Sequence, residues 1–161
     1  MKIRVGFGYD VHQLKPGIAF VLGGINIRHN KGSLGHSDGD VLIHAICDAL
    51  LGAANLRDIG FHFPDTDKQY KGIDSKILLK NTVKLLEEYK YSVENIDSTI
   101  CLQQPKIKDK IPEMIETLAR VMNLDKEDVS IKATTTENMG FIGREEGVAA
   151  YATVLIKKSE D

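Results

Sequence analysis

Two residues near the N-terminus, Asp10 and His12, combine a carboxylate with an imidazole at a spacing of two. The odd-numbered positions of residues 3–9 are all apolar, and this period of two predicts a half-buried strand that leads into the pair. Side chains two apart in a strand point to the same face, so Asp10 and His12 project together. Both donor types suit zinc, although a lone pair of this kind is more often an ordinary polar strand end.

A further candidate ligand comes from residues 40–53, an apolar segment that predicts a buried helix. Its ionisable residues Asp40, His44 and Asp48 are spaced by four and therefore line one stripe. Buried ionisable groups are costly unless they are paired or bind a metal, but a solvated helix edge explains the stripe equally well. A third ligand from this stripe would complete an Asp-His-His set with an open fourth zinc position, and the neighbouring acids could orient the ligands.

A run of hydroxyl groups, Thr134-Thr135-Thr136, leaves a predicted strand and is followed by Glu137. Hydroxyl and backbone N–H groups at a strand end can hold phosphate oxygens, and a carboxylate beside them suits Mg²⁺. Threonine is also simply a common strand residue, so the structural and functional interpretations are comparable here. Arg144, in the same loop, offers a bidentate phosphate contact, although an isolated loop arginine is more often solvated.

Three shorter segments carry polar groups whose ordinary interpretation is turn chemistry. They are Asp58-Ile59-Gly60, Phe63-Pro64-Asp65-Thr66-Asp67 and Gln104-Pro105-Lys106. The sequence contains no Gly-x-Ser-x-Gly, Cys-x-x-Cys, His-Glu-x-x-His or P-loop pattern, so it offers no evident covalent nucleophile. That absence favours a metal-assisted reaction between groups that the substrate itself carries.

The remaining patterns predict the elements that position these groups. Strands are expected near residues 3–9, 18–27, 96–102, 129–133 and 148–156, and helices over 40–53, 75–90 and 109–123. Ser37 or Asp38 is expected to cap the first helix, and residues 28–39, 55–74 and 134–147 are expected to be loops. This order predicts one α+β domain over residues 1–161, a mixed β-sheet with helices packed on one face.

Composition excludes several classes of function. The formal net charge is −2, so the whole protein has no positive field to gather nucleic acid. No apolar run approaches the roughly 20 residues that span a bilayer, and the N-terminus enters a strand pattern without a signal-peptide core. Cys47 and Cys101 form no zinc or redox spacing, so we expect buried free thiols and a cytoplasmic location without membrane partners.

Taken together, the polar segments resemble the 2-C-methyl-D-erythritol 2,4-cyclodiphosphate synthase family. The matching segments are Asp10-Val11-His12, His36-Ser37-Asp38-Gly39-Asp40 with His44, Asp58-Ile59-Gly60, Phe63-Pro64-Asp65-Thr66-Asp67, Gln104-Pro105-Lys106, and Lys132-Ala133-Thr134-Thr135-Thr136-Glu137 followed by Gly140-Phe141 and Arg144. Each segment is weak by itself, but they occur in the family's order and spacing over nearly the whole chain.

The resemblance implies a phosphorus–oxygen lyase of the non-mevalonate route to isoprenoid precursors. The substrate would be 4-diphosphocytidyl-2-C-methyl-D-erythritol 2-phosphate, whose own 2-phosphate attacks the β-phosphorus, expels CMP and closes a cyclic diphosphate. The family is a homotrimer with active sites between neighbouring subunits, so the resemblance implies a trimer here as well.

The resemblance also implies roles for the matching residues. Asp10, His12 and His44 match the family's zinc ligands, and Glu137 matches the residue that holds a second divalent cation, Mg²⁺ or Mn²⁺. His36 and Thr135 match catalytic positions that stabilise the transition state. The positions that match substrate contacts are Asp10, His12, His36, Ser37, Asp58, Gly60, Phe63, Asp65, Asp67, Leu102, Pro105, Lys106, Ile107, Lys108, Ala133, Thr134, Thr135, Glu137, Phe141 and Arg144. Among these, residues 102–108 match the cytidine pocket.

Two other classes of function remain open at this point. A zinc-dependent hydrolase or phosphodiesterase on a similar scaffold would use zinc-bound water and release linear phosphates. A non-catalytic trimer that binds nucleotide or metal is the other, and the intact set of Asp10, His12, His44 and Glu137 argues against it. The cyclase interpretation is preferred because it accounts for every polar cluster at once.

Overall fold

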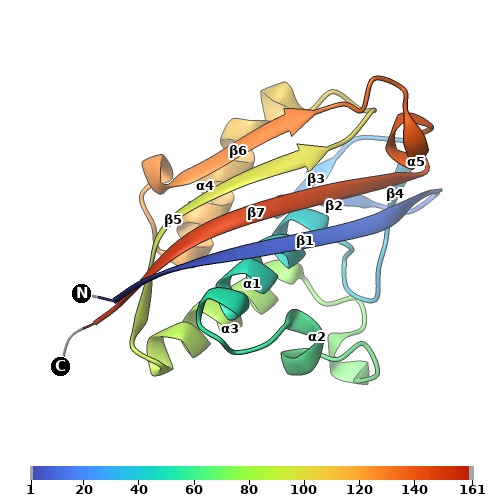
Figure 1. Ribbon diagram of the computed structural model, residues 1–161. Helices are drawn as coiled ribbons and strands as arrows, with labels where there is room; N and C mark the ends of the chain where they lie inside the picture. Colours follow the sequence, from blue (N-terminus) through green and yellow to red (C-terminus); the bar gives the residue numbers. More distant parts are fainter. Residues whose placement is uncertain (1, 160–161) are drawn as a thin grey trace.

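The computed structural model describes residues 2–159, which form a five-stranded sheet with helices on one face (Figure 1). The strand order is β4-β1-β7-β5-β6, in which β5 and β6 are parallel and the other neighbours are antiparallel. These strands are β1 Lys2–Pro16, β4 Lys31–Leu34, β5 Tyr91–Cys101, β6 Val129–Thr134 and β7 Gly147–Lys158. A separate hairpin pairs β2 Phe20–Leu22 with β3 Ile25–Ile27. The predicted single-domain α+β fold with a mixed sheet is confirmed.

The hydrophobic core lies between this sheet and the helices. The helices are α1 Val41–Ala53, α2 Ile59–His62, α3 Ser75–Glu88, α4 Ile111–Met122 and α5 Gly140–Gly143, with short 3-10 turns η1 Lys68–Tyr70, η2 Lys108–Lys110 and η3 Lys126–Asp128. Helix α1 is buried almost all round, as its apolar sequence predicts. Within residues 2–159, no helix is long and apolar enough to cross a membrane.

Two glycines allow α1 to lie directly against β1. A Cβ atom at Gly6 would stand 1.9 Å from the carbonyl oxygen of Ala49, and one at Gly8 would stand 1.9 Å from that of Ala45. No side chain tolerates such contacts, so glycine at both positions permits the close approach of strand and helix. The same approach brings the middle of α1 to the end of β1 that carries Asp10 and His12.

The start of α1 is fixed by a carboxylate that is fully buried. Asp40 caps the helix by accepting the backbone N–H of Ile43 at 3.1 Å, and it also accepts those of Gly23 at 3.0 Å and Gly24 at 2.6 Å. The prediction that Ser37 or Asp38 caps this helix is therefore wrong. The turn of the β2–β3 hairpin presents two N–H groups that need an acceptor, and Asp40 joins this turn to the helix.

The three predicted loops contain short elements that sequence periodicity cannot reveal. Residues 28–39 include β4, residues 55–74 include α2 and η1, and residues 134–147 include α5. Each of these elements has three or four residues, too few for a repeating pattern to register.

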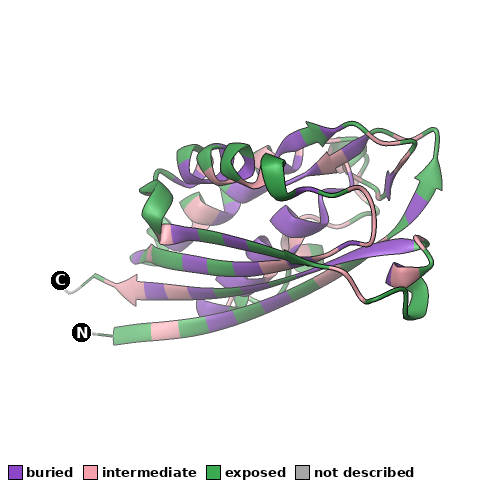
Figure 2. Cartoon of the chain, turned by 90° about the horizontal axis from the view of Figure 1, so that it is seen from above, coloured by how far each residue is buried: buried purple, intermediate pink, exposed green. Residues whose placement is uncertain are grey.

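One face of the sheet is apolar and exposed. Along β1 the apolar odd-numbered side chains point away from the helices, and Ile3, Val5 and Phe7 remain 52%, 67% and 64% exposed. Figure 2 shows exposed and less exposed residues alternating along this strand. Tyr9, Val11 and Tyr151 continue the exposed apolar face, with Tyr9 and Tyr151 in ring contact. The predicted strand is present, but the face that carries Gly6 and Gly8 packs against α1, while no other part of residues 2–159 covers its apolar face.

Candidate active site

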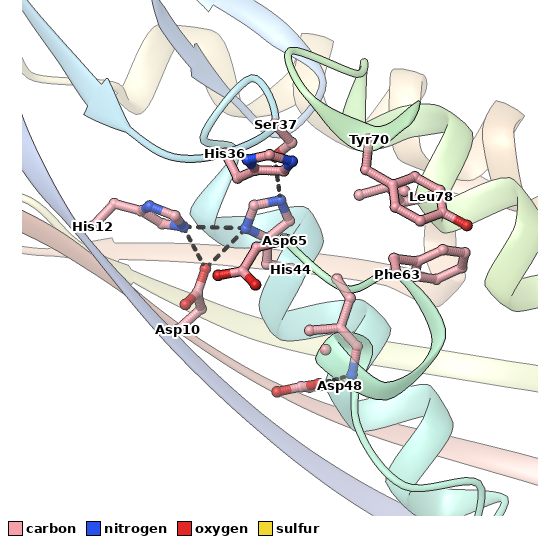
Figure 3. Close-up of a pocket in the computed structure, with 12 residues that line it drawn as sticks. Asp10, His12, His36, Ser37, His44, Asp48, Phe63, Asp65, Tyr70 and Leu78 are labelled. Atoms are coloured by element: carbon pink, nitrogen blue, oxygen red, sulfur yellow. Dashed lines mark hydrogen bonds and ion pairs between the residues drawn. The ribbon is translucent and has the colours of Figure 1, made fainter. Parts of the chain in front are cut away.

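Three side chains from two elements converge on one point. Asp10 and His12 project from β1, and His44 reaches them from the first half of α1 (Figure 3). The Oδ2 atom of Asp10 lies 2.8 Å from Nε2 of His12 and 3.0 Å from Nδ1 of His44, and the two ring nitrogens are 3.1 Å apart. These three groups form a candidate binding site for a metal ion.

The geometry and chemistry of this set fit a divalent cation. A tetrahedral zinc ion with bonds of ~2.0–2.1 Å would space its ligand atoms by roughly 3.3 Å, close to the separations between these donors. One carboxylate and two imidazoles are ligands that zinc accepts, and three of them leave a fourth position for a substrate oxygen. Asp10, His12 and His44 are each partly buried, so a bound cation would be shielded from bulk water on the protein side.

The charges within the site favour a cation. Burial by itself raises the pKa of Asp10, but hydrogen bonds with His12 and His44 outweigh burial and lower it to about 2. Burial lowers the pKa of His12, but its hydrogen bond with Asp10 and the negative charge of that carboxylate outweigh burial and raise it. Asp10 is therefore an anion throughout the neutral range and supplies the negative charge of the site.

The outer nitrogen of each imidazole is also held. Nδ1 of His12 lies 2.7 Å from the backbone carbonyl oxygen of Leu34, which can only accept, so Nδ1 donates and Nε2 presents its lone pair to the site. Nε2 of His44 lies 3.0 Å from the hydroxyl oxygens of both Ser37 and Ser75. Both rings thus have fixed orientations, as is usual for imidazoles that bind metals.

A cavity of about 350 Å³, here called the metal-side cavity, opens beside the three groups. Eight of its twelve lining residues are sequence-predicted site residues: Asp10, His12, His36, Ser37, His44, Gly60, Phe63 and Asp65. The other four are Asp48, Ile59, Tyr70 and Leu78. Figure 3 shows that residues from β1, α1 and the segment after α1 surround the same space. The fold therefore gathers residues that lie far apart in the sequence.

A second cavity of about 170 Å³, here called the threonine-side cavity, is lined by Leu102, Pro105, Lys106, Ile107, Lys108, Ala133, Thr134 and Thr135. All eight are predicted substrate contacts. Lys106 and Lys108 are exposed, so they offer positive charge at its rim. The Thr135 hydroxyl donates to Oε1 of Glu137 at 3.3 Å, which places the predicted second metal ligand beside the threonine run.

The two cavities lie at the same end of the sheet but do not meet within one chain. In the strand pairing, Val11 is opposite Ala149, Ala149 is opposite Cys101, and Cys101 is opposite Thr134. Three strand spacings of roughly 4.8 Å separate β1 from β6, which amounts to about 14 Å. None of the residues that line the metal-side cavity also lines the threonine-side cavity.

Five predicted contacts line neither of these cavities: Asp58, Asp67, Glu137, Phe141 and Arg144. Asp58 caps α2, and Asp67 caps η1. The guanidinium group of Arg144 donates to both carboxylate oxygens of Glu146 at 3.0 and 3.1 Å. In one chain, the arginine is therefore paired with a neighbouring acid.

Comparison with known proteins identifies the group to which this arrangement belongs. A model of the YgbB family matches residues 3–157. The chain belongs to the YgbB family. The resemblance drawn from the separate polar segments is thereby confirmed.

Individual members of the YgbB family show how close the similarity is. The Bacteroides thetaiotaomicron protein named 2-C-methyl-D-erythritol 2,4-cyclodiphosphate synthase is 67% identical over 98% of this chain and 99% of its own length. The structure of the bifunctional IspDF from Campylobacter jejuni matches 99% of this chain with a TM-score of 0.95 and 42% identity, and this chain spans 43% of that longer protein. The IspF CDP complex from Plasmodium falciparum matches with a TM-score of 0.86 and 34% identity over 98% of this chain and 97% of that one.

Within the family fold, the structure adds residues that the sequence patterns missed. Ser75 is fully buried, is 31 residues from His44 in the chain, and contacts its ring. Asp48 accepts the backbone N–H of Ile59 at 2.7 Å and so ties α1 to the start of α2. Burial, followed by the charges of Asp58 and Asp10, raises the pKa of Asp48 despite this hydrogen bond. Asp40, His44 and Asp48 thus have three separate roles, and neither carboxylate is hydrogen-bonded to the His44 ring, whose partners are Asp10, His12, Ser37 and Ser75.

Proposed function

We propose that this chain converts 4-diphosphocytidyl-2-C-methyl-D-erythritol 2-phosphate to 2-C-methyl-D-erythritol 2,4-cyclodiphosphate and CMP. The observation that carries the proposal is the convergence of Asp10, His12 and His44 at a cavity in a chain 67% identical to a protein named for this reaction. The enzyme is a phosphorus–oxygen lyase of the non-mevalonate pathway. Its cytoplasmic location stays a prediction from the sequence.

The reaction moves one phosphoryl bond within the substrate. An oxygen of the 2-phosphate forms a bond to the β-phosphorus, the bond from that phosphorus to the bridging oxygen breaks, and CMP leaves with this oxygen. The attacking phosphate is already an anion, so no strong general base is required. Positioning and charge stabilisation therefore account for most of the catalysis.

The metal-side cavity would hold the methylerythritol phosphate part of the substrate. Asp10, His12 and His44 would hold zinc, which supplies Lewis-acid stabilisation of charge on a phosphate oxygen when it is bound. His36 is exposed at the cavity and can donate a proton in a hydrogen bond to the phosphate as negative charge develops. Ser37 and Gly60 line the same cavity and would contact the sugar alcohol, together with Asp58.

The threonine-side cavity would hold the cytidine diphosphate part. The apolar side chains of Leu102 and Ile107 are buried at its base, and Lys106 and Lys108 flank it. Thr135 would donate to the phosphates, and Glu137 would hold Mg²⁺ or Mn²⁺ against them. Phe141 and Arg144 would add contacts from the loop that follows. The CDP named in the Plasmodium falciparum complex supports a cytidine nucleotide ligand.

One substrate must reach both cavities, and a homotrimer offers a way to bring them together. Two observations support it: strands β1 and β6, which carry residues of the two cavities, are about 14 Å apart across the sheet of one chain, and the sheet face beside them is apolar and exposed at Val5, Phe7 and Tyr151. A second copy packed on this face would bury those side chains. The metal-side cavity of one subunit would then face the threonine-side cavity of the next.

Phosphorus NMR with the cytidyl substrate, zinc and Mg²⁺ tests the proposed reaction directly. The expected result is the joint appearance of CMP and a cyclic diphosphate. Linear phosphate products would instead identify a hydrolase. If protein with bound zinc shows no turnover, the chain has the family's fold and metal site but does not catalyse this reaction. That result would refute the proposal.

A further inference from the structure

The second ring nitrogen of His44 faces a buried hydroxyl that none of the site predictions includes. Nε2 of His44 lies 3.0 Å from Oγ of Ser75, the first residue of α3, whose side chain is fully buried. Ser75 does not line the metal-side cavity, whereas Ser37, the other hydroxyl near this nitrogen, does. Ser75 therefore contacts the His44 ring at a point that is not exposed to the cavity where a substrate would bind.

Asp38 determines the direction in which the Ser75 hydroxyl points its proton. The carboxylate of Asp38 accepts the Ser75 hydroxyl at 2.5 Å and the Ser75 backbone N–H at 2.9 Å. A hydroxyl has one proton, and a carboxylate can only accept, so the Ser75 proton is committed to Asp38. The oxygen of Ser75 is then left as an acceptor for its other two neighbours, Nε2 of His44 at 3.0 Å and the Ser37 hydroxyl at 3.4 Å. When Nδ1 of His44 binds a cation, the ring proton is on Nε2, where the Ser75 oxygen accepts it.

We propose that Ser75, held by Asp38, is a positioning residue that fixes the orientation of His44 for cation binding. A neutral imidazole binds a metal through its unprotonated nitrogen, and the Asp38-Ser75 pair supports the ring so that Nδ1 is directed toward Asp10 and His12. The inference rests on the metal site of the proposed function. It adds a relay from a carboxylate through a buried hydroxyl to a ligand ring.

Backbone contacts keep this relay in register. The N–H of Asp38 donates to the carbonyl oxygen of Ile73 at 3.0 Å, and the N–H of Gly72 donates to that of His36 at 2.8 Å. The start of α3 is thus attached to the loop before α1 on both sides of the relay. These two hydrogen bonds hold the start of α3, which carries Ser75, against the loop that leads into α1, which carries His44. They therefore help to keep Ser75 at hydrogen-bonding distance from His44.

The test compares Ser75→Ala with Thr82→Val in the full-length protein after removal of metal. Thr82 is a second fully buried hydroxyl on α3, bonded to the carbonyl oxygen of Leu78 at 2.9 Å, so its loss serves as the matched structural control. Zinc affinity is measured by competition with a chromophoric chelator. Ser75→Ala is expected to weaken zinc binding by about 10- to 100-fold, the usual effect of losing a group that orients a ligand. Thr82→Val is expected to leave the affinity within about twofold, since it contacts no ligand.

Two further measurements keep the inference falsifiable if Ser75→Ala folds poorly. Nitrogen-15 NMR of the zinc-loaded parent protein is expected to show His44 bound to the metal through Nδ1, with its proton on Nε2. Asp38→Asn retains the Ser75 side chain but replaces one acceptor oxygen, and a weaker zinc affinity than that of the parent is expected.

The possible results separate the relay from the metal site. Unchanged zinc affinity in a folded Ser75→Ala protein, or zinc bound to His44 through Nε2 in the parent, would overturn the role of Ser75 alone. If Ser75→Ala and Thr82→Val lose the same zinc affinity, Ser75 contributes only to packing, and the proposed positioning role is wrong. A parent protein that takes up no divalent cation would overturn the metal site of the proposed function, and the relay with it.

Discussion

The metal-side and threonine-side cavities lie at the same end of one sheet, but their polar groups are held very differently. Around the metal-side cavity, His12 and His44 have hydrogen-bond partners on both ring nitrogens, and buried Ser75 supports one of them. Around the threonine-side cavity, the hydroxyls make only local bonds, such as Thr136 to the carbonyl oxygen of Met139 at 2.7 Å, and Glu137 is exposed.

This difference indicates which of the two cavities has its polar groups ordered by the folding of one chain. The metal-side groups come from β1, α1 and α3, which pack in the core, so the folding of one chain orders them. The threonine-side groups lie at the end of β6, an edge strand of the sheet, and in the loop that follows. They are expected to gain their final arrangement from a neighbouring subunit and from the substrate phosphates.

The largest effect is expected from His44→Ala, which removes a ligand from the ordered cavity. Bound zinc should be lost and turnover should fall about 10³-fold or more, because metal stabilisation of phosphoryl charge is worth several kcal/mol. Metal analysis and product formation measure the two effects. His29→Ala, at a half-buried histidine outside the site, is the control. Full activity without His44 would remove it from the site.

Phe7→Glu tests whether the two cavities are joined by a second copy of the chain. A charge at this exposed apolar position should prevent subunits from packing, yield monomers in sedimentation, and reduce turnover by roughly 100-fold or more. Zinc binding should survive, since the ligands come from one chain.

Ile77→Glu is the matched control for Phe7→Glu, because Ile77 is 48% exposed on α3, away from the sheet face. It should alter neither the oligomeric state nor the rate. An active monomer after Phe7→Glu would contradict an active site shared between subunits.

The two cysteines differ in burial, and we expect them to differ in reactivity as well. Cys47 lies in α1 and is fully buried, and burial raises the pKa of its thiol to about 12. Cys101 pairs with Thr134 in the sheet and is only half-buried, although burial raises its pKa as well. Thiol reagents at pH 8 should therefore modify Cys101 more than about tenfold faster than Cys47, because the thiolate reacts. Mass spectrometry of single-cysteine variants measures both rates, and faster labelling of Cys47 would contradict the tight packing of α1, the helix that carries His44.

The smallest effect is expected from Glu137→Gln at the exposed rim of the threonine-side cavity. Loss of one carboxylate charge should raise the Mg²⁺ concentration for half-maximal rate about five- to tenfold, within the ~1–4 kcal/mol of a unit-charge contact near a protein surface. Metal titrations of the rate measure this shift. Glu127→Gln, at an exposed position in η3, is the control and should change nothing. Unchanged Mg²⁺ dependence in Glu137→Gln would exclude this residue as a ligand.

The sequence predicted the long elements well because their periodicity is strong. Spacing made Asp10, His12 and a residue of the α1 stripe candidate ligands, and the family resemblance selected His44 from that stripe. The structure brings these three candidates together. The sequence missed the role of Ser75 because a single serine at a helix start gives no signal, and its contact with His44 is long-range. It assigned the cap of α1 to Ser37 or Asp38 because local preference cannot anticipate the hairpin that binds Asp40.

The amino-acid sequence by itself determined the fold class, the family and the identity of the three groups of the candidate metal site, because these depend on local spacing and on the order of short segments. Only the tertiary structure decided which face of β1 meets the helices. The alternation of apolar residues 3–9 defines two faces, but Gly6 and Gly8 allow the closer approach of α1 to the other one. The same packing decides that the two cavities stay separate within one chain, since strand order in a sheet is set by long-range pairing.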